Sequence, residues 1–267
     1  MKNFFAFGCS FTNYIYPTWV DFVDLHDSVD RTYNFGASGA GNKYILTQLF
    51  YLLENYTPSE QDTLAFMFTS SPRYDWINKG DGWVLSGNMF NCHLYKELQL
   101  DEIWSTNTGV LDAYLSIKTV IELTKSLNCK TIFMSAFGPE NSIGEYNTPS
   151  NDTATSDRYT DMVASFHRNF NHGANLRDLS IIHTGYTKYA FADTGPDGHP
   201  SIEDHRFWVE THMKDYYCGT AAEKAKEWEN LIIKKTVPET GDTYKSIRNV
   251  IPLHDKMSQE ELRSLLR

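Results

Sequence analysis

The sequence of 267 residues lacks several features that mark particular classes of protein. No run of about 18 apolar residues occurs, so no membrane-spanning helix and no membrane partner are predicted. Basic residues are in the minority, with 24 Lys and Arg against 34 Asp and Glu and a net charge of -10, which disfavours a nucleic-acid partner. No CxxC pair occurs, so neither a zinc site nor a disulfide framework is indicated. The four cysteines are Cys9, Cys92, Cys129 and Cys218.

Other common signatures are incomplete. The start, Met1–Cys9, superficially resembles a lipoprotein signal, but its apolar stretch is too short and predicts a first strand instead, which leaves the cytoplasm as the default location. The glycines of residues 36–41 follow the order GxxGxG rather than the GxGxxG of a dinucleotide site. His205 and His212 lie seven positions apart without an evident third ligand. We therefore expect neither a cofactor nor a metal.

What is present indicates one substantial core, because 41% of the residues are hydrophobic and 14% are aromatic. Short apolar runs alternate with segments of helical periodicity, which predicts a three-layer α/β/α sandwich with a flavodoxin-like parallel sheet. The expected strands are residues 4–7, 32–35, 63–68, 131–136 and 179–182. The expected helices are residues 44–53, 111–127 and 202–216, the last with Ser201 as its N-cap.

The remaining segments interrupt this alternation. Residues 72–109 and 138–178 are interpreted as insertions of the kind that commonly shape binding clefts. From residue 218 onward the chain changes to a charged helix over 221–235 and a final helix opened by a capping box at 258–261. We therefore divide the chain into an α/β domain, residues 1–217, and a helical C-terminal extension, residues 218–267.

Ser10 is the first candidate for chemistry, because it lies just past the first predicted strand. In a doubly wound sheet, ligands bind beyond the carboxyl ends of the strands. The backbone N–H groups of Ser10 and Phe11 would then point at one place and could hold an oxyanion. A serine after a strand is also an ordinary turn residue.

The second candidate is the segment Asp197-Gly198-His199-Pro200. A serine hydroxyl needs a base, which is usually His, and the base needs a carboxylate that fixes its tautomer. The same segment is also typical of an exposed turn.

Taken together, these segments resemble the SGNH hydrolase family, also called GDSL-like esterases and lipases. Gly8-Cys9-Ser10-Phe11-Thr12 stands where the family has Gly-Asp-Ser-x-Ser, and Asp197-Gly198-His199-Pro200 stands where it has Asp-x-x-His. Asn34–Gly39 matches the family's glycine block. The resemblance spans roughly residues 4–217. It implies that Ser10 is the nucleophile, that Asp197 and His199 complete a triad, and that Gly39 donates to the oxyanion.

Three departures from the family pattern qualify this prediction. Cys9 replaces an aspartate outside the triad, and Asp197 precedes His199 by two residues rather than three, with Asp193 as the fallback. After strand 63–68 the family has Gly-x-Asn-Asp, whose asparagine donates to the oxyanion. This chain has Thr69-Ser70-Ser71-Pro72-Arg73 instead. Asn42, Ser70 or Ser71 is a possible substitute donor, and Arg73 could engage an anionic or carbohydrate substrate or form a surface ion pair.

The sequence thus predicts a serine esterase that acts on a small-molecule or glycan ester, such as an acetyl ester on a carbohydrate. Two alternatives stay open. A sugar hydroxyl could replace water, which gives an acyltransferase, or a chain without the family's asparagine could be a non-catalytic module that binds a glycan or a protein. The oligomeric state is not predicted.

Overall fold

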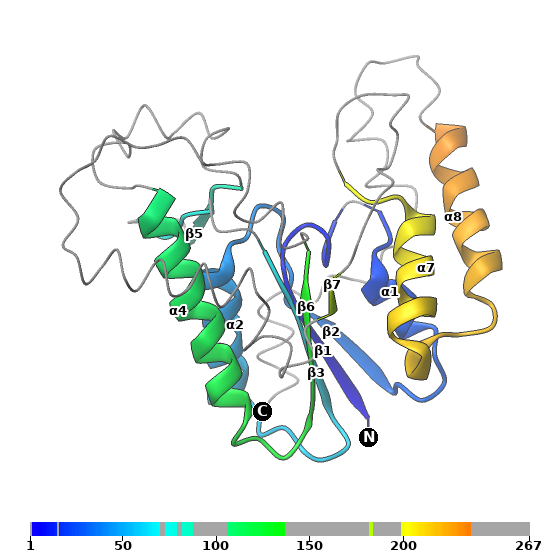
Figure 1. The fold of residues 1–267 in the computed structure, drawn as a ribbon. Coiled ribbons are helices and arrows are strands. Elements are labelled where there is room, and N and C mark those ends of the chain that lie inside the picture. The colour runs from blue at the N-terminus through cyan, green and yellow to red at the C-terminus, as the bar shows by residue number, and fades with distance from the viewer. Residues whose placement is uncertain are drawn as a thin grey trace.

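A five-stranded parallel sheet forms the centre of the computed structural model (Figure 1). Its strands are β1 (Asn3–Phe7), β2 (Arg31–Asn34), β3 (Thr63–Phe68), β6 (Lys130–Ser135) and β7 (Ile182–His183), in the order β2-β1-β3-β6-β7. This is the flavodoxin-like order. The chain places β2 on one side of β1 and then β3, β6 and β7 on the other side, so the order of strands switches between β1 and β3. The structure describes residues 2–14, 16–69, 73–78, 82–87, 106–136, 182–183 and 199–235.

Helices cover both faces of the sheet (Figure 1). The helices α2 (Asn42–Asn55) and α4 (Thr106–Thr124) lie on one face. The helices α1 (Trp19–Asp24), α7 (Ile202–His212) and α8 (Ala221–Lys235) lie on the other, with the 3-10 helix η4 (Lys214–Tyr216) between the last two. The predicted three-layer α/β/α architecture is confirmed.

Alternation along the strands builds two separate cores. On β1, Phe5 and Phe7 face α2 and α4, where Phe7 stacks on Phe66 of β3 with 4.7 Å between ring centroids. Phe4 and Ala6 face the opposite helices. Because both faces are covered, the central strands β1 and β3 are nearly continuous runs of apolar residues rather than alternating ones, and every residue of both strands is buried.

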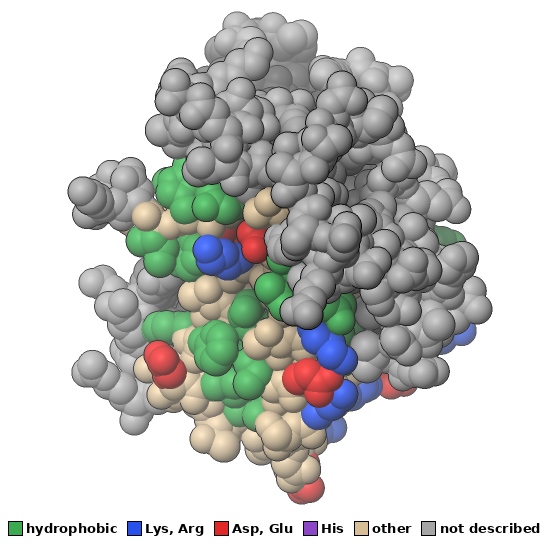
Figure 2. Space-filling view, turned by 60° about the vertical axis from the view of Figure 1, so that its left-hand side comes forward, with side chains coloured by type: hydrophobic (Ala, Val, Ile, Leu, Met, Phe, Trp, Pro, Cys, Tyr) green, Lys and Arg blue, Asp and Glu red, His purple; other side chains and the backbone are tan. Residues whose placement is uncertain are grey.

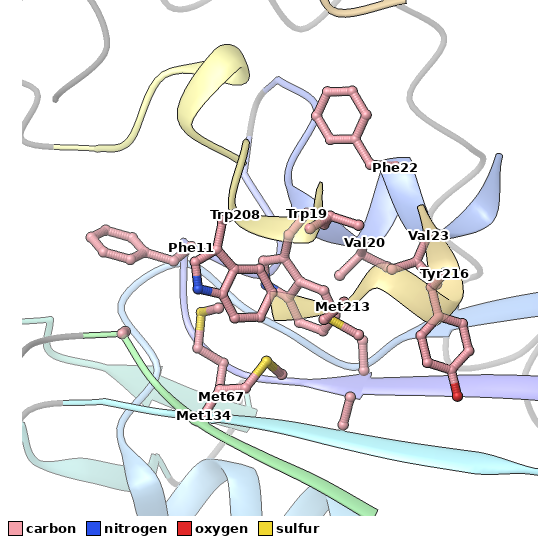
Figure 3. Packing of buried hydrophobic residues seen from close by; sticks show 14 of the residues in the cluster. Phe11, Trp19, Val20, Phe22, Val23, Met67, Met134, Trp208, Met213 and Tyr216 are labelled. Carbon is pink, nitrogen blue, oxygen red and sulfur yellow. The ribbon is translucent and has the colours of Figure 1, made fainter. Parts of the chain in front are cut away.

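The second core is built around two tryptophans (Figure 3). Trp19 of α1 meets Trp208 of α7 edge to face, with 5.8 Å between ring centroids. Met67 and Met134 from the sheet and Met213 after α7 fill the space beside the rings. This cluster joins the N-terminal part of the chain to the segment that follows residue 199.

The boundaries differ from the sequence predictions in instructive places. Strand 63–68 coincides with β3, and Ser201 is confirmed as an N-cap, since its Oγ accepts the N–H of Asp204 at 3.0 Å. A single helix was predicted over residues 202–216. In the structure, α7 ends at His212 and the 3-10 helix η4 follows it. The region interpreted as the insertion 72–109 contains an antiparallel hairpin of β4 (Asp75–Asn78) and β5 (Gly82–Leu85).

The start of the predicted C-terminal extension contributes to the α/β core. Ala221 and Ala225 of α8 are fully buried, and Trp228 packs against Phe22 of α1 with 5.1 Å between ring centroids. Residues 236–267, including the predicted final helix, lie outside the described residues. The boundary at residue 218 stays a prediction.

The surface over α2 and α4 carries exposed apolar side chains, among them Phe50 and Leu115. Figure 2 shows hydrophobic side chains on one face of the molecule, interspersed with charged ones of both signs. Within the described ranges, no helix combines the length and the apolar character that crossing a membrane requires.

Candidate active site

Ser10 lies in a tight turn directly after β1, at the point where the sheet order reverses. The carbonyl of Cys9 accepts the N–H groups of Thr12 and Asn13 at 2.9 and 3.1 Å, which closes the turn. Glycine is required at the start of this turn, because a Cβ on Gly8 would lie 2.0 Å from Thr12 Oγ1. The turn aims Ser10 at the carboxyl edge of the sheet, where ligands bind in such folds.

His199 meets Ser10 across 189 positions of sequence. Its Nε2 lies 2.8 Å from Ser10 Oγ, within the range for proton transfer between a hydroxyl and a general base. Ser10 is buried, with 4% of its surface exposed, and His199 is half-buried. The backbone behind His199 is held as well, because Tyr16 donates its hydroxyl to the Pro200 carbonyl at 3.0 Å.

Ser10 and Gly39 are the residues whose backbone N–H groups the sequence predicts to hold an oxyanion. Neither the N–H of Ser10 nor that of Gly39 donates a hydrogen bond to any residue that the structure describes. Gly39 has a φ of 81°, in the left-handed region that glycine adopts without strain. An N–H group that makes no hydrogen bond within the protein is the kind of donor that can stabilise an oxyanion.

The turn with Ser10 and the glycine loop, defined as residues 34–41, are tied together directly. Asn34 donates from Nδ2 to the Thr12 carbonyl at 2.8 Å and accepts the N–H of Gly36 at 3.0 Å. Asn13 donates to the Gly36 carbonyl at 2.8 Å. These side-chain bonds to backbone fix the position of the two segments relative to each other.

The β4–β5 hairpin holds the glycine loop from the other side. Arg73 donates from Nη1 to the Ala40 carbonyl at 2.8 Å, and Gly87 donates its N–H to the Gly39 carbonyl at 3.0 Å. Asp75 accepts the N–H of Gly41 with its two oxygens at 2.9 and 3.0 Å. Three successive residues of the loop are thus bound by the hairpin and the residues that flank it.

Asp75 also caps α2, whose N-cap residue is Gly41 and therefore has no side chain of its own. Its Oδ2 accepts the N–H of Tyr44 at 2.9 Å. Burial raises the pKa of Asp75, while the N–H donors of Tyr44 and Gly41 and the charge of Arg73 act in the opposite direction. Burial, and then the charge of Asp75, raises the pKa of Tyr44 to about 12.

Asn42 joins the start of α2 to the end of β3. Its Nδ2 donates to the Thr69 carbonyl at 2.8 Å and its Oδ1 accepts the Thr69 N–H at 3.0 Å. An amide nitrogen carries two hydrogens, so one N–H of Asn42 remains for another acceptor. Asn42 therefore has a structural function, because it ties the start of α2 to Thr69, the first residue after β3.

A second histidine lies close to the first. His205 is 1% exposed on α7. Burial, and then the charge of His199, lowers the pKa of His205 to about 3. His205 is therefore neutral at physiological pH and adds no positive charge beside His199.

The structure brings together Ser10 and His199, with Gly39, Asn42 and Arg73 in or against the adjoining loop. The predicted Asp197, its fallback Asp193, and Ser70 and Ser71 lie outside the described residues. The sequence prediction missed Tyr14, which stacks on His199, and Asp75. A signal for Asp75 existed in the glycine N-cap of α2, which leaves the helix N-terminus in need of a distant acceptor.

Comparison with known proteins gives distant likenesses. No model of a known protein family matches the chain, and no curated protein matches it. A member of the lipolytic G-D-S-L family from Veillonella parvula is 14% identical, with a TM-score of 0.43 over 80% of this chain and 97% of that one. A candidate acylhydrolase from Bacteroides fragilis is 15% identical, with a TM-score of 0.42 over 84% of this chain and 88% of that one. The chain is similar to these two solved structures.

Proposed function

We propose that this chain is a serine hydrolase of the SGNH type that cleaves a carboxylic ester. The observation that carries the proposal is the 2.8 Å contact between Ser10 Oγ and His199 Nε2, formed by the two segments that resemble the first and last family motifs. A serine hydroxyl becomes a useful nucleophile only beside a base, and this contact supplies one.

The reaction follows from these positions. Ser10 Oγ attacks the ester carbonyl carbon as its proton passes to His199 Nε2, and the carbonyl electron pair moves onto the oxygen. The N–H groups of Ser10 and Gly39 hold that oxyanion, with Asn42 or Ser70 as a further donor. His199 then protonates the leaving alcohol. Water, deprotonated by His199, attacks the acyl-enzyme, and its cleavage releases the acid and restores Ser10.

Asp197 is proposed as the carboxylate that orients His199. An acetyl ester on a carbohydrate is the proposed substrate class, and Arg73 is a proposed contact for its polar or anionic groups. Replacement of water by a sugar hydroxyl would give acyl transfer by the same residues.

The test is hydrolysis of p-nitrophenyl acetate by wild type and by Ser10→Ala. Wild type should release p-nitrophenol, and Ser10→Ala should lose most of this activity while it stays folded. Ser28→Ala is a matched control, because Ser28 Oγ also lies against a histidine, at 2.7 Å from His26 Nδ1, but on the turn before β2. It should keep the wild-type rate.

A second readout identifies the nucleophile itself. A fluorophosphonate should add to Ser10, which mass spectrometry of the digested protein would locate, and should not add to Ser10→Ala. Equal hydrolysis by wild type and Ser10→Ala, together with no label on Ser10, would contradict the proposal and favour a non-catalytic binding module.

A further inference from the structure

Aromatic rings enclose the imidazole of His199. The ring of Tyr14 lies against it nearly in parallel, with 4.0 Å between centroids and an interplanar angle of 15°. The ring of Phe11 meets it edge to face, with 5.6 Å between centroids and an angle of 68°. The imidazole is therefore contacted by the rings of Tyr14 and Phe11 as well as by Ser10.

Tyr14 is itself held in place by its neighbour. It packs edge to face against Tyr16, with 4.8 Å between centroids and an angle of 83°. Tyr16 is 1% exposed and donates its hydroxyl to the Pro200 carbonyl. The segment that follows Ser10 thus contacts both the ring of His199 and the backbone next to it.

We propose that Tyr14 is a positioning residue that fixes the ring plane of His199 and places an aromatic face against the imidazole during ester cleavage. The inference rests on the proposed function. When Ser10 Oγ–H gives its proton to Nε2, the imidazole becomes a cation against the face of an aromatic ring. Such a cation is attracted by the ring, and more strongly where water is excluded. The stack also restricts rotation of the imidazole, which keeps Nε2 directed at Ser10.

Kinetics separate this role from simple packing. Tyr14→Leu removes the ring and should lower kcat about ten-fold with little change in KM, since the cation forms only after the substrate binds. Tyr14→Phe keeps the ring face and should stay within about two-fold of wild type on the same argument. An unchanged kcat in folded Tyr14→Leu, or an equal loss in Tyr14→Phe, would overturn the proposal.

A matched control exists on β2. Tyr33 stacks on Phe5 with 4.9 Å between centroids and an angle of 12°, a geometry like that of Tyr14 on His199. Tyr33→Leu should lower the melting temperature without changing kcat. A fall in kcat as large as that of Tyr14→Leu would show that the loss follows from general destabilisation, and would overturn the proposal.

A spectroscopic readout needs no turnover. An aromatic ring facing the imidazole shifts the His199 Hε1 proton resonance upfield, and His199→Gln identifies this resonance by its disappearance. Tyr14→Leu should move this resonance downfield, and Tyr14→Phe should leave it in place. An unmoved resonance in Tyr14→Leu would show that the ring of Tyr14 does not stack on His199. An inactive wild type with an upfield resonance would overturn the proposed function but support the positioning of the ring.

Discussion

Asp75 on β4 binds the N–H of Gly41 with both carboxylate oxygens, although the two residues lie 34 positions apart. The bond makes the hairpin part of the candidate site. Gly41 ends the loop that contains Gly39, and the same hairpin region binds the carbonyls of Gly39 and Ala40. A group that holds an oxyanion is effective only when it is positioned before the reaction. We infer that the hairpin provides this positioning.

Replacement of Asp75 by asparagine tests the inference. The amide presents N–H groups to the donors of Gly41 and Tyr44, so at least one buried bond is lost, at a cost of about 1–3 kcal/mol in the free energy of unfolding. Displacement of the Gly39 N–H should lower kcat about ten-fold or more, short of the roughly 100- to 1000-fold loss for deletion of an oxyanion donor. Urea unfolding and ester hydrolysis measure the two effects.

Asp62→Asn is the control for Asp75→Asn. Asp62 is also a buried carboxylate that accepts backbone N–H groups, from Ser59 at 2.8 Å and from Asn3 at 3.1 Å, but it lies at the amino edge of the sheet. Asp62→Asn should lose about as much free energy of unfolding as Asp75→Asn and should keep the wild-type kcat. If Asp75→Asn and Asp62→Asn both lose kcat to an extent that follows their loss of stability, the fall in kcat comes from general destabilisation. The hairpin would then have no specific function in the site.

Gly39→Ala should damage the loop at the predicted oxyanion donor. The added Cβ would lie 3.0 Å from the Leu85 carbonyl oxygen, and the φ of 81° is unfavourable for alanine. Gly82→Ala is the control, since Gly82 has a φ of 88° and nothing within 4 Å of the added Cβ. Both should lose roughly 1–2 kcal/mol of stability. Only Gly39→Ala should lower kcat, and unchanged turnover by it would remove Gly39 from the proposed mechanism.

Sequence patterns predicted the layers of this fold because burial on both faces makes parallel strands continuously apolar. Residues 63–68 are the clearest case, since the expected and observed strands coincide. The β4–β5 hairpin was missed because its strands are short and contain polar residues such as Asp75 and Asn78. Helix α1, with six residues, is too short to show a helical period.

In the candidate site, too, some residues were predicted from the sequence and others were missed. Ser10 and His199 were predicted as partners only through their resemblance to family motifs, because no local rule brings together residues 189 positions apart. Tyr14 was missed since a tyrosine outside the helices and strands has no periodic signal. Its contact with His199 depends on the packing of α1 against α7, through Trp19 and Trp208.

Tyr16→Phe tests how the backbone beside His199 is held. The variant keeps the ring but leaves the buried Pro200 carbonyl without its donor, which should cost about 1–3 kcal/mol in stability. Because Pro200 adjoins His199, kcat should also fall. The fold decrease in kcat should be larger than any fold increase in KM. Thermal unfolding and steady-state kinetics measure these effects. Normal kcat with reduced stability would limit Tyr16 to a structural role.

His205 should make the folded state sensitive to mild acid. Burial lowers its pKa from 6.5 to about 3, so below pH 6.5 the unfolded chain takes up a proton that the folded chain does not. Stability is therefore fully present above pH 6.5 and falls by up to about 1.4 kcal/mol per pH unit below it. Burial also lowers the pKa of His212, which acts in the same direction.

Urea unfolding at pH 7.5 and 5.5 measures the effect. The loss of unfolding free energy between these pH values should be smaller in His205→Gln than in wild type, because the other groups titrate in both proteins. An equal loss in the two proteins would mean that His205 is protonated in the folded state as readily as in the unfolded chain.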